Sequence, residues 1–270
     1  MFYSYKKLVL FCTAIIFFLL YSLAAQAKGA IASFPNKVNL TVQRSESIEY
    51  DINLATSPYF IFLPSNYTGR EAFGLIAYTS ASEQFSELPP EWEQVLARNK
   101  LILICPQNAG NECGSHRRHG LTVLGTLAAS QYYNIDKKRI YAAGFSGGAR
   151  IASNVAFLQP DLYCGTIQSC GTNFYKNVPR QYAAESVDTR QNKYGVVQVP
   201  ANLVQLAKSK IRFALITGSN DFRYGNIKDI FQNGFYKEGF KVKMFDIPGM
   251  QHTDCDGNSL DQAVRFVDGK

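Results

Sequence analysis

The amino-acid sequence predicts an α/β protein with a mostly parallel central sheet and helices on both of its faces. The first observation is an alternation of apolar, strand-like runs with amphipathic, helix-like stretches, which is typical of parallel sheets covered by helices. The second is the composition of the 270-residue chain, because 46% hydrophobic and 18% charged residues suit one sizeable buried core. The third is a group of short strand-like runs near the start, which indicates an antiparallel entry into the sheet.

The expected elements follow one another in a regular order. The antiparallel entry consists of strands over residues 38–43, 47–53 and 59–63. Each later helix is predicted from apolar residues at helical spacing, such as Ile151, Val155 and Leu158. The later strands are expected at 73–79, 100–105, 139–145, 165–169, 212–217 and 242–247, and the helices at 89–99, 121–133, 147–158, 227–238 and 260–267.

Residues 28–270 are expected to form a single domain, because α/β chains of roughly 200–250 residues commonly fold as one unit. Residues 171–210 stand out within it, since their periodicity is weak and they include the run Asn173, Phe174 and Tyr175. A stretch of this length without a clear element is more often a binding loop than a simple connection. We therefore interpret residues 171–210 as a lid-like or substrate-selecting insertion.

The first 27 residues have the pattern of an export signal. Lys6 and Lys7 precede an apolar stretch over residues 8–20, and small residues that a signal peptidase accepts follow at Ala25 and Ala27. The alternative is an uncleaved membrane anchor, but the apolar stretch is shorter than the ~20 residues that span a bilayer. We expect a signal peptide over residues 1–27 and an exported, periplasmic or secreted, product without stable membrane insertion.

The charge of the chain excludes an obvious nucleic-acid partner. The formal net charge is +7, and removal of Lys6 and Lys7 with the signal leaves 7 − 2 = +5. This is mild for a chain of this size, and no cluster of Lys and Arg alternates with aromatic residues. We expect no nucleic-acid binding, and the sequence does not determine the oligomeric state.

Cysteines in an exported protein are expected to form disulfide bonds. Five remain after the signal, so at least one thiol should stay unpaired. The pair Cys105 and Cys113 closes a short loop, while Cys113 with Cys170 or Cys255 is an alternative. Cys164 and Cys170 are expected to lie about 20 Å apart along one strand, too far for a bond.

The pattern that points to chemistry is Gly144-Phe145-Ser146-Gly147-Gly148, a G-x-S-x-G motif between a predicted strand and a predicted helix. A serine on such a tight turn has a strained backbone, and only small residues fit two positions away on either side. The turn also places the hydroxyl at a helix N-terminus, where N–H groups favour developing negative charge. Ser146 is therefore the candidate nucleophile.

A serine nucleophile needs a base to take its proton. The chain has three histidines, His116, His119 and His252. In strand–turn–helix hydrolases the order along the chain is serine, acid, histidine, so only His252 comes late enough. It follows the strand expected at 242–247 by five residues, in a loop at a carboxyl end. We predict that His252 is the base.

The base in turn needs an acid that holds its tautomer. Asp221 comes shortly after the strand expected at 212–217, at a position where ligands gather in open α/β sheets. Asp229 and Asp246 are poorer candidates because they fall inside a predicted helix and a predicted strand. Asp254 is too near His252 in sequence to approach its ring comfortably. Asp221 is therefore the predicted acid.

The oxyanion hole requires two backbone N–H groups. Gly147, directly after the nucleophile, is expected to supply one. The loop after the strand at 73–79 is expected to supply the second, from Ser80 or Ala81. The alternative for this loop is a simple polar turn.

A second cluster, Cys105, Cys113, His116 and His119, has the residue types of a zinc site. Its spacing resembles no common ligand knuckle, and thiols in an oxidising compartment usually pair, so we predict no metal site. The neighbouring Arg117 and Arg118 are interpreted as a solvated loop face, with binding of an acidic substrate group as the alternative.

These motifs resemble the α/β-hydrolase superfamily, and more closely its exported esterases grouped with poly(3-hydroxybutyrate) depolymerases and feruloyl or acetyl-xylan esterases. The similar stretches are SPYFIFLPSNY, RIYAAGFSGGARIASNVAF, ALITGSND and IPGMQH, which together span most of the chain after the signal. The resemblance implies Ser146 as nucleophile, Asp221 as acid, His252 as base and Gly147 as an oxyanion donor. The chain departs from these esterases in lacking their usual His-Gly pair after the strand that ends at Thr79.

The predicted function is that of an exported serine hydrolase that cleaves carboxylic esters through an acyl-enzyme. The ester, small or polymeric, is implied by the resemblance, and no cofactor is expected. The alternatives are a serine peptidase of the same fold and a hydrolase fold kept as a binding module without turnover.

Overall fold

The structure is a computed structural model that describes residues 29–35, 50–183 and 198–270. The predicted signal peptide, the strand expected at 38–43 and residues 184–197 of the predicted insertion lie outside the described residues. Of the helices in the described ranges, none combines the length and the apolar character needed to cross a lipid bilayer.

A single eight-stranded sheet forms the centre of the fold, with the strand order β1-β2-β4-β3-β5-β6-β7-β8. Strand β2 is antiparallel to both β1 and β4, and every other neighbouring pair is parallel. The predicted α/β class with a mostly parallel sheet is therefore confirmed. The strands are β1 (Ala30–Ser33), β2 (Pro58–Phe62), β3 (Phe73–Thr79), β4 (Leu101–Pro106), β5 (Ile135–Phe145), β6 (Gly165–Ser169), β7 (Arg212–Thr217) and β8 (Lys241–Asp246).

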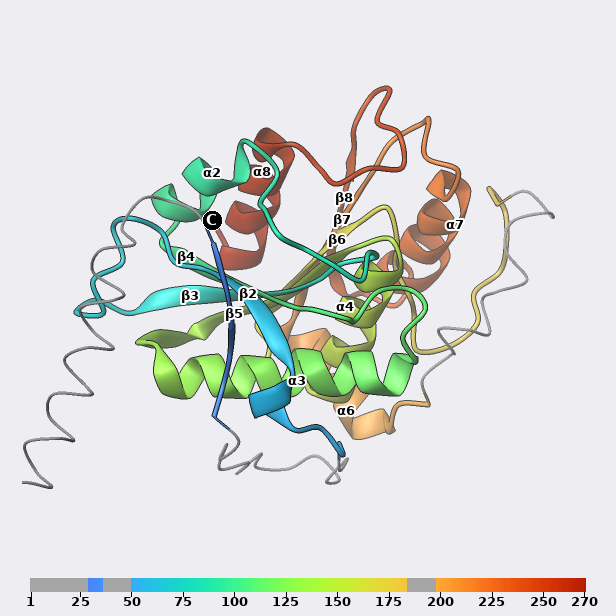
Figure 1. The fold of residues 1–270 in the computed structure, drawn as a ribbon. Helices are drawn as coiled ribbons and strands as arrows, with labels where there is room; N and C mark the ends of the chain where they lie inside the picture. Colours follow the sequence, from blue (N-terminus) through green and yellow to red (C-terminus); the bar gives the residue numbers. More distant parts are fainter. Residues whose placement is uncertain (1–28, 36–49, 184–197) are drawn as a thin grey trace, which may run out of the picture.

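Helices cover both faces of this sheet (Figure 1). Helices α2 and α8 pack together on one face, and α3, α4 and α6 cover the other. The helical elements are η1 (Leu54–Thr56), α2 (Trp92–Arg98), α3 (Ser115–Tyr132), α4 (Gly147–Leu158), α6 (Ala201–Lys210), α7 (Tyr224–Asp229), a π-helix η2 (Ile230–Tyr236) and α8 (Gly257–Asp268).

The predicted strand over 47–53 is wrong in its described part, because residues 50–53 form no strand. Tyr50 and Ile52 instead pack against α3, where a Cβ atom on Gly120 would come within 2.6 Å of either side chain. The antiparallel entry is formed by β1 and β2. The absence of a side chain at Gly120 thus allows Tyr50 and Ile52 to pack against α3.

Two hydrophobic cores lie on the two faces of the sheet, and strand β3 contributes side chains to both. Phe73, Leu75 and Ala77 belong to the core under α3 and α4, whereas Ile76 and Tyr78 belong to the core under α2 and α8. Alternate side chains of a strand point to opposite faces, so a strand buried on both sides is apolar throughout. This explains why FGLIAYT shows no polar alternation.

A third, aromatic core lies beside α6, and it accounts for part of the predicted insertion. Phe174 contacts Phe157 and Phe235 with ring centroids 5.9 and 4.9 Å apart. Val204 and Ala207 of α6 are buried in the same cluster. Residues 201–210 therefore form a helix that covers the sheet, where the sequence indicated no clear element.

Candidate active site

The turn between β5 and α4 carries Ser146 in a strained backbone conformation. Its φ is 54° and its ψ is −113°, a region that residues with a side chain rarely occupy. A 2.8 Å hydrogen bond from Ser146 N to Ser169 O at the end of β6 helps to hold the turn. The hydroxyl thus lies at the N-terminus of a 12-residue helix, where developing negative charge is favoured.

Three glycines allow the chain to pass close to this turn. A Cβ atom on Gly144 would come within 2.5 Å of the backbone of Gly148, and one on Gly148 within 1.8 Å of Thr79 O. A Cβ on Gly171 would lie 2.2 Å from Ser146 O. The small residues predicted around the nucleophile are therefore required by contact with the ends of β3 and β6.

Ser146, His252 and Asp221 meet above the carboxyl ends of β5, β7 and β8. The distance from His252 Nε2 to Ser146 Oγ is 2.9 Å, and that from His252 Nδ1 to Asp221 Oδ1 is 2.7 Å. An ionised carboxylate only accepts hydrogen bonds, so Nδ1 carries the proton and Nε2 is free to accept from the serine hydroxyl. The arrangement can therefore move a proton from Ser146 to His252.

Asp221 is buried and held on both carboxylate oxygens. Thr217 Oγ1 donates to Oδ2 at 2.7 Å, and the backbone N–H of Arg223 donates to Oδ1 at 2.9 Å. Burial acts to raise the pKa of Asp221, but the hydrogen bonds from His252, Arg223 and Thr217 outweigh it and lower the pKa below its ordinary value. The lowered pKa favours the carboxylate form of Asp221, which accepts a hydrogen bond from His252 Nδ1.

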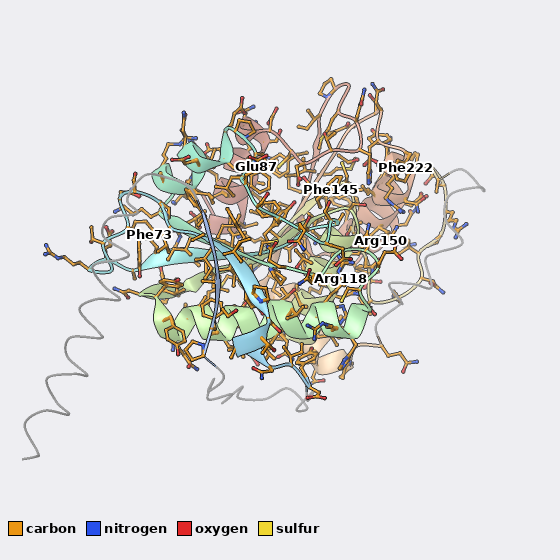
Figure 2. All side chains as sticks on the ribbon, viewed as in Figure 1. Phe73, Glu87, Arg118, Phe145, Arg150 and Phe222 are labelled. Atoms are coloured by element: carbon orange, nitrogen blue, oxygen red, sulfur yellow. The ribbon has the colours of Figure 1, made fainter. Side chains whose placement is uncertain are left out.

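Two aromatic rings flank the imidazole of His252. The Phe145 and Phe222 rings have centroids 5.0 and 4.2 Å from it. Both phenylalanines appear in Figure 2 towards the same end of the sheet, far from Phe73 at the start of β3. Sequence reasoning missed these two residues, although each directly precedes or follows a predicted triad member.

Solved structures of low sequence identity have a similar fold. No protein-family model matches the chain, and no curated protein matches it in sequence. A ferulic acid esterase structure is 15% identical, covers 90% of this chain and 98% of its own, and has a TM-score of 0.60. The α/β-hydrolase fold is therefore present here.

Two further solved structures have a similar fold. The S-formylglutathione hydrolase of Staphylococcus aureus is 14% identical, covers 90% of this chain and 98% of its own, and has a TM-score of 0.58. The ferulic acid esterase of Anaeromyces mucronatus is 12% identical, covers 89% and 90%, and has a TM-score of 0.58. Identities this low establish the α/β-hydrolase fold and leave the substrate open.

In an α/β-hydrolase fold the second oxyanion donor comes from the loop after β3. This loop lies against the nucleophile turn here, because Thr79 O is the atom that a side chain on Gly148 would strike. Arg118 Nη2 donates to Ser80 O at 2.8 Å, and the backbone N–H of Asn111 donates to Ala81 O at 2.9 Å. Both carbonyl groups of the candidate donors are thus fixed.

Arg118 corrects the interpretation of Arg117 and Arg118 as a solvated face. Arg117 is exposed, but the Arg118 side chain is fully buried beneath the Ser80–Ala81 peptide. In a trans peptide the carbonyl and the following N–H point in opposite directions. A hydrogen bond to Ser80 O therefore sets the direction of the Ala81 N–H, a role that the sequence did not indicate.

The other carboxylates near the site are engaged elsewhere. Asp229 accepts hydrogen bonds from the backbone N–H groups of residues 181–183. Tyr224 Oη donates to Asp246 at 2.5 Å, and Tyr78 Oη donates to Asp254 at 2.5 Å. Among the acids weighed from the sequence, Asp221 is the one within hydrogen-bonding distance of His252.

The five cysteines in the described residues are free thiols, so the expected disulfide bonding is wrong for them. Cys105 is buried in the core under α2 and α8, whereas Cys113 lies just before α3, the helix on the opposite face. Cys105 is thus a buried core residue and Cys113 a partly exposed loop residue, and neither is bonded to the other. Short sequence spacing does not guarantee the Cα approach that a disulfide needs.

Cys105, Cys113, His116 and His119, which have the residue types of a zinc site, lie in different surroundings. Burial lowers the pKa of His119 to about 4, and its Nε2 lies 3.3 Å from Asn154 Nδ2. His116 is exposed, with its ring 5.1 Å from that of Tyr50. These four residues are not among the groups of described side chains whose potential ligand atoms lie within 4.8 Å of one another.

Cys170, Asp221 and His252 are the one group of potential metal ligands in the described ranges whose ligand atoms all lie within 4.8 Å of one another. Burial and the Asp221 charge raise the pKa of the Cys170 thiol, whereas metals bind the thiolate. His252 and Asp221 are already hydrogen-bonded to each other. This donor set fits a proton relay better than a metal site.

Proposed function

We propose that the protein is a serine hydrolase that cleaves carboxylic esters, with Ser146 as nucleophile, His252 as general base and Asp221 as the acid that orients it. The single observation that supports this most is the continuous pair of hydrogen bonds from Ser146 Oγ through His252 to Asp221. A serine hydroxyl is a poor nucleophile until such a base removes its proton. The three residues together supply that activation.

In the proposed reaction, Ser146 Oγ attacks the ester carbonyl carbon while its proton passes to His252 Nε2. The N–H of Gly147 and the N–H of Ala81 or Ser80 stabilise the tetrahedral oxyanion, a contribution of about 3–4 kcal/mol for one such donor. The intermediate collapses when the bond to the alcohol oxygen breaks, and His252 protonates the alcohol. Water, deprotonated by His252, then attacks the acyl-serine and releases the carboxylic acid.

An ester substrate is preferred to a peptide for two reasons. The motifs around Ser146, Asp221 and His252 resemble those of exported esterases. The structures compared above include two ferulic acid esterases and an S-formylglutathione hydrolase, a thioester hydrolase by its name. None of the proposed steps requires a cofactor.

Export is the second part of the proposal. Residues 1–27 have the charge pattern, apolar stretch and small residues of a signal peptide, which leaves a domain over 28–270. N-terminal sequencing of the protein recovered from the medium or periplasm tests this, with a start at Lys28 expected. An N-terminus at Met1 in a membrane fraction would contradict it.

The catalytic proposal is tested by Ser146→Ala, assayed on short nitrophenyl esters. We expect kcat/KM to fall by roughly 10⁴-fold or more, because the remaining residues stabilise the transition state without a nucleophile. Ser209→Ala, at an exposed position on α6, is the matched control and should keep wild-type turnover. Unchanged turnover in Ser146→Ala would discard the mechanism.

A further inference from the structure

A buried tyrosine ties the loop that carries His252 to strand β3. Tyr78 is the last but one residue of β3, and its Oη donates a 2.5 Å hydrogen bond to Oδ1 of Asp254. The Tyr78 side chain is 2% exposed and lies in the core under α2 and α8. A single side-chain hydrogen bond thus joins two segments that are 176 positions apart in the chain.

This hydrogen bond lies between two parts of the proposed catalytic site. Ser80 and Ala81, the candidates for the second oxyanion donor, follow Tyr78 by two and three residues. Asp254 follows His252 by two residues. The bond therefore connects the strand that leads into the oxyanion loop with the loop that carries the base.

The surroundings of the pair make Tyr78 the donor. Burial and the charge of Asp254 raise the pKa of Tyr78 well above its ordinary value, so the phenol keeps its proton. Burial also raises the pKa of Asp254, while the hydrogen bond from Tyr78 and the charge of His252 act to lower it. The contact is thus a directional bond from a neutral phenol to a carboxyl oxygen.

Two further contacts hold the backbone of the same loop. Trp92 Nε1 donates a 2.8 Å hydrogen bond to Cys255 O, and the Trp92 ring packs edge-on against Tyr78 with centroids 5.4 Å apart. On another side, Cys170 Sγ lies 3.3 Å from Thr253 O. The three residues after His252 are therefore each held by a different part of the fold, and Tyr78 holds the middle one.

Stability alone gives little reason for this pair. A polar pair in an apolar core has a desolvation cost, and apolar residues of similar volume often stabilise a fold equally well. Catalysis, in contrast, depends on precise placement, because a displacement of about 1 Å can cost about 100-fold in rate. The distance from His252 Nε2 to Ser146 Oγ is 2.9 Å, so a small shift of the loop would break this contact.

We propose that Tyr78 and Asp254 are a positioning pair for the proposed catalytic site. Their hydrogen bond holds the loop after His252 in register with β3, so that the base stays in contact with Ser146 while the oxyanion loop faces the same reacting carbonyl. The inference rests on the proposed function, because it explains how the base is placed. Both residues act through His252, and neither is assigned a contact with substrate.

The first test is Tyr78→Phe, which removes the hydroxyl and keeps the ring. We expect kcat on a nitrophenyl ester to fall by about 10- to 100-fold, with KM changing by less than about threefold, because a misplaced base slows the chemical steps. A rise in KM at unchanged kcat would overturn the proposal. So would wild-type kcat in this variant.

The matched control is Tyr141→Phe. Tyr141 is also a fully buried tyrosine of the sheet, and it donates to Asp268 at the end of α8. Its loss should lower the free energy of unfolding, measured with urea, and leave kcat unchanged at a temperature where the variant is folded. A similar fall of kcat in Tyr78→Phe and Tyr141→Phe would overturn the proposal, because it would show a general effect of lost stability.

A second pair of variants changes the acceptor. Asp254→Asn keeps a side-chain oxygen that can accept from Tyr78, whereas Asp254→Leu has a similar size and no acceptor. We expect Asp254→Asn to retain at least about fivefold more kcat than Asp254→Leu. Equal kcat in these two variants would contradict a role for the hydrogen bond.

A spectroscopic measurement separates the failure of this inference from the failure of the proposed function. The proton between His252 Nδ1 and Asp221 gives a downfield proton resonance that needs no substrate. It should shift or broaden in Tyr78→Phe and remain as in the wild type in Tyr141→Phe. An unchanged resonance in Tyr78→Phe rejects the positioning pair, even where no ester is hydrolysed. Ser146-dependent turnover with wild-type kcat in Tyr78→Phe rejects the pair and retains the hydrolase.

Discussion

The hydroxyl of Thr217 donates a 2.7 Å hydrogen bond to Oδ2 of Asp221, and this bond leaves Oδ1 for His252 and the Arg223 N–H. Thr217 is the last residue of β7 and is fully buried. The end of a strand thus fixes the rotation of the carboxylate. The lowered pKa of Asp221 favours its ionised form.

Asp221→Asn should reduce kcat by about 10⁴-fold, because an amide in this position favours the wrong imidazole tautomer. Steady-state kinetics on a nitrophenyl ester measure the effect. The matched control is Asp246→Asn, an exposed aspartate whose partner is Tyr224. A similar loss in both variants would point to a general electrostatic effect and against a specific role for Asp221.

Arg118→Met should lower kcat by roughly 10- to 100-fold with little change in KM, because the Ala81 N–H loses its fixed direction and an oxyanion donor acts in the transition state. Inhibition by a boronic acid, which forms a tetrahedral adduct, should weaken in parallel. Arg117→Met is the control, since Arg117 is exposed beside it, and Arg118→Lys should restore part of kcat. A rise in KM at constant kcat would contradict this positioning role.

Phe222→Ala should reduce kcat by about 3- to 10-fold, because the imidazole loses a ring contact that limits its rotation. The side chain is 61% exposed, so we expect the free energy of unfolding to change by less than about 0.5 kcal/mol. Tyr236→Ala, at 71% exposure, serves as the matched aromatic control. If both variants retained wild-type kcat, the ring would have no part in orienting His252.

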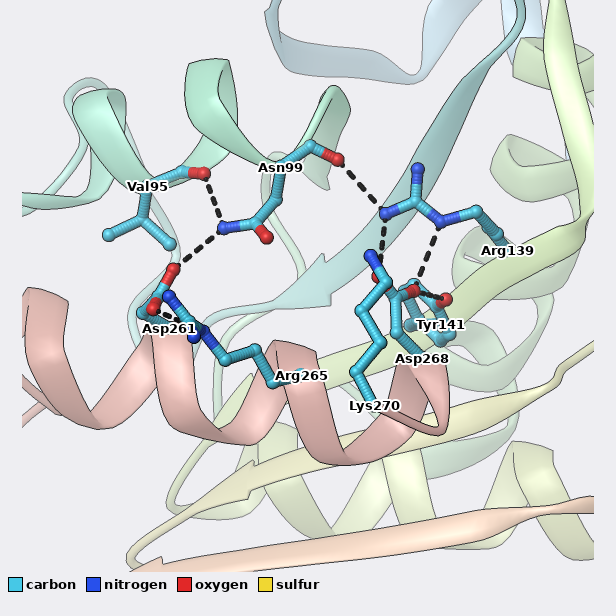
Figure 3. A network of polar contacts seen from close by, with 8 residues as sticks. All are labelled: Val95, Asn99, Arg139, Tyr141, Asp261, Arg265, Asp268 and Lys270. Atoms are coloured by element: carbon cyan, nitrogen blue, oxygen red, sulfur yellow. Dashed lines mark hydrogen bonds and ion pairs between the residues drawn. The ribbon is translucent and has the colours of Figure 1, made fainter.

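Asp268 anchors the end of α8 to β5, as Figure 3 shows. Arg139 donates to both of its carboxylate oxygens, and Tyr141 and Lys270 donate to it as well. Burial acts to raise its pKa, but the hydrogen bonds from Arg139, Tyr141 and Lys270 lower it. Asp268→Asn should therefore destabilise the fold by about 3 kcal/mol at pH 7, measured by urea unfolding.

The effect of Asp268→Asn should depend on pH. A carboxylate whose pKa is lowered in the folded state stabilises the fold fully at pH values above its pKa in the unfolded state, here near 3.8. This stabilisation is lost as the pH falls through its pKa in the folded state. The difference in the free energy of unfolding between wild type and variant should thus be largest at pH 7 and become smaller below about pH 4. Asp161→Asn, at an exposed turn, should differ from the wild type by only a small free energy of unfolding at every pH. If the difference for Asp268→Asn increased on acidification, the stabilising role of the ionised Asp268 would be contradicted.

Much of the sheet could be predicted from the sequence, because its strands are buried on both faces and appear as short apolar runs. Strands β3, β6 and β7 have the bounds expected of them. The start of α3 was missed by six residues, at Ser115 and not at residue 121. Its first turns carry His116, Arg117 and Arg118, which have no apolar periodicity.

The three principal candidate residues could be found because one motif and one rule of chain order identify them. The loop after Thr79 and the cavity lined by Arg150 and Arg223 could not be predicted in the same way. Arg118 is buried by its contact with Ser80, 38 positions away, and a single basic residue in sequence is normally exposed. Arg150 and Arg223 both line this cavity but come from separate segments of the chain, so no local sequence pattern predicts it.

The proposed mechanism requires Ser146 to become covalently acylated, and mass spectrometry can measure this acylation. The protein is mixed with a nitrophenyl ester, quenched in acid within milliseconds to seconds, and digested. We predict that the peptide containing Ser146 gains the mass of the acyl group, that the adduct disappears as substrate is exhausted, and that Ser146→Ala never forms it. Acylation at another residue, or full turnover without an adduct on Ser146, would contradict the account.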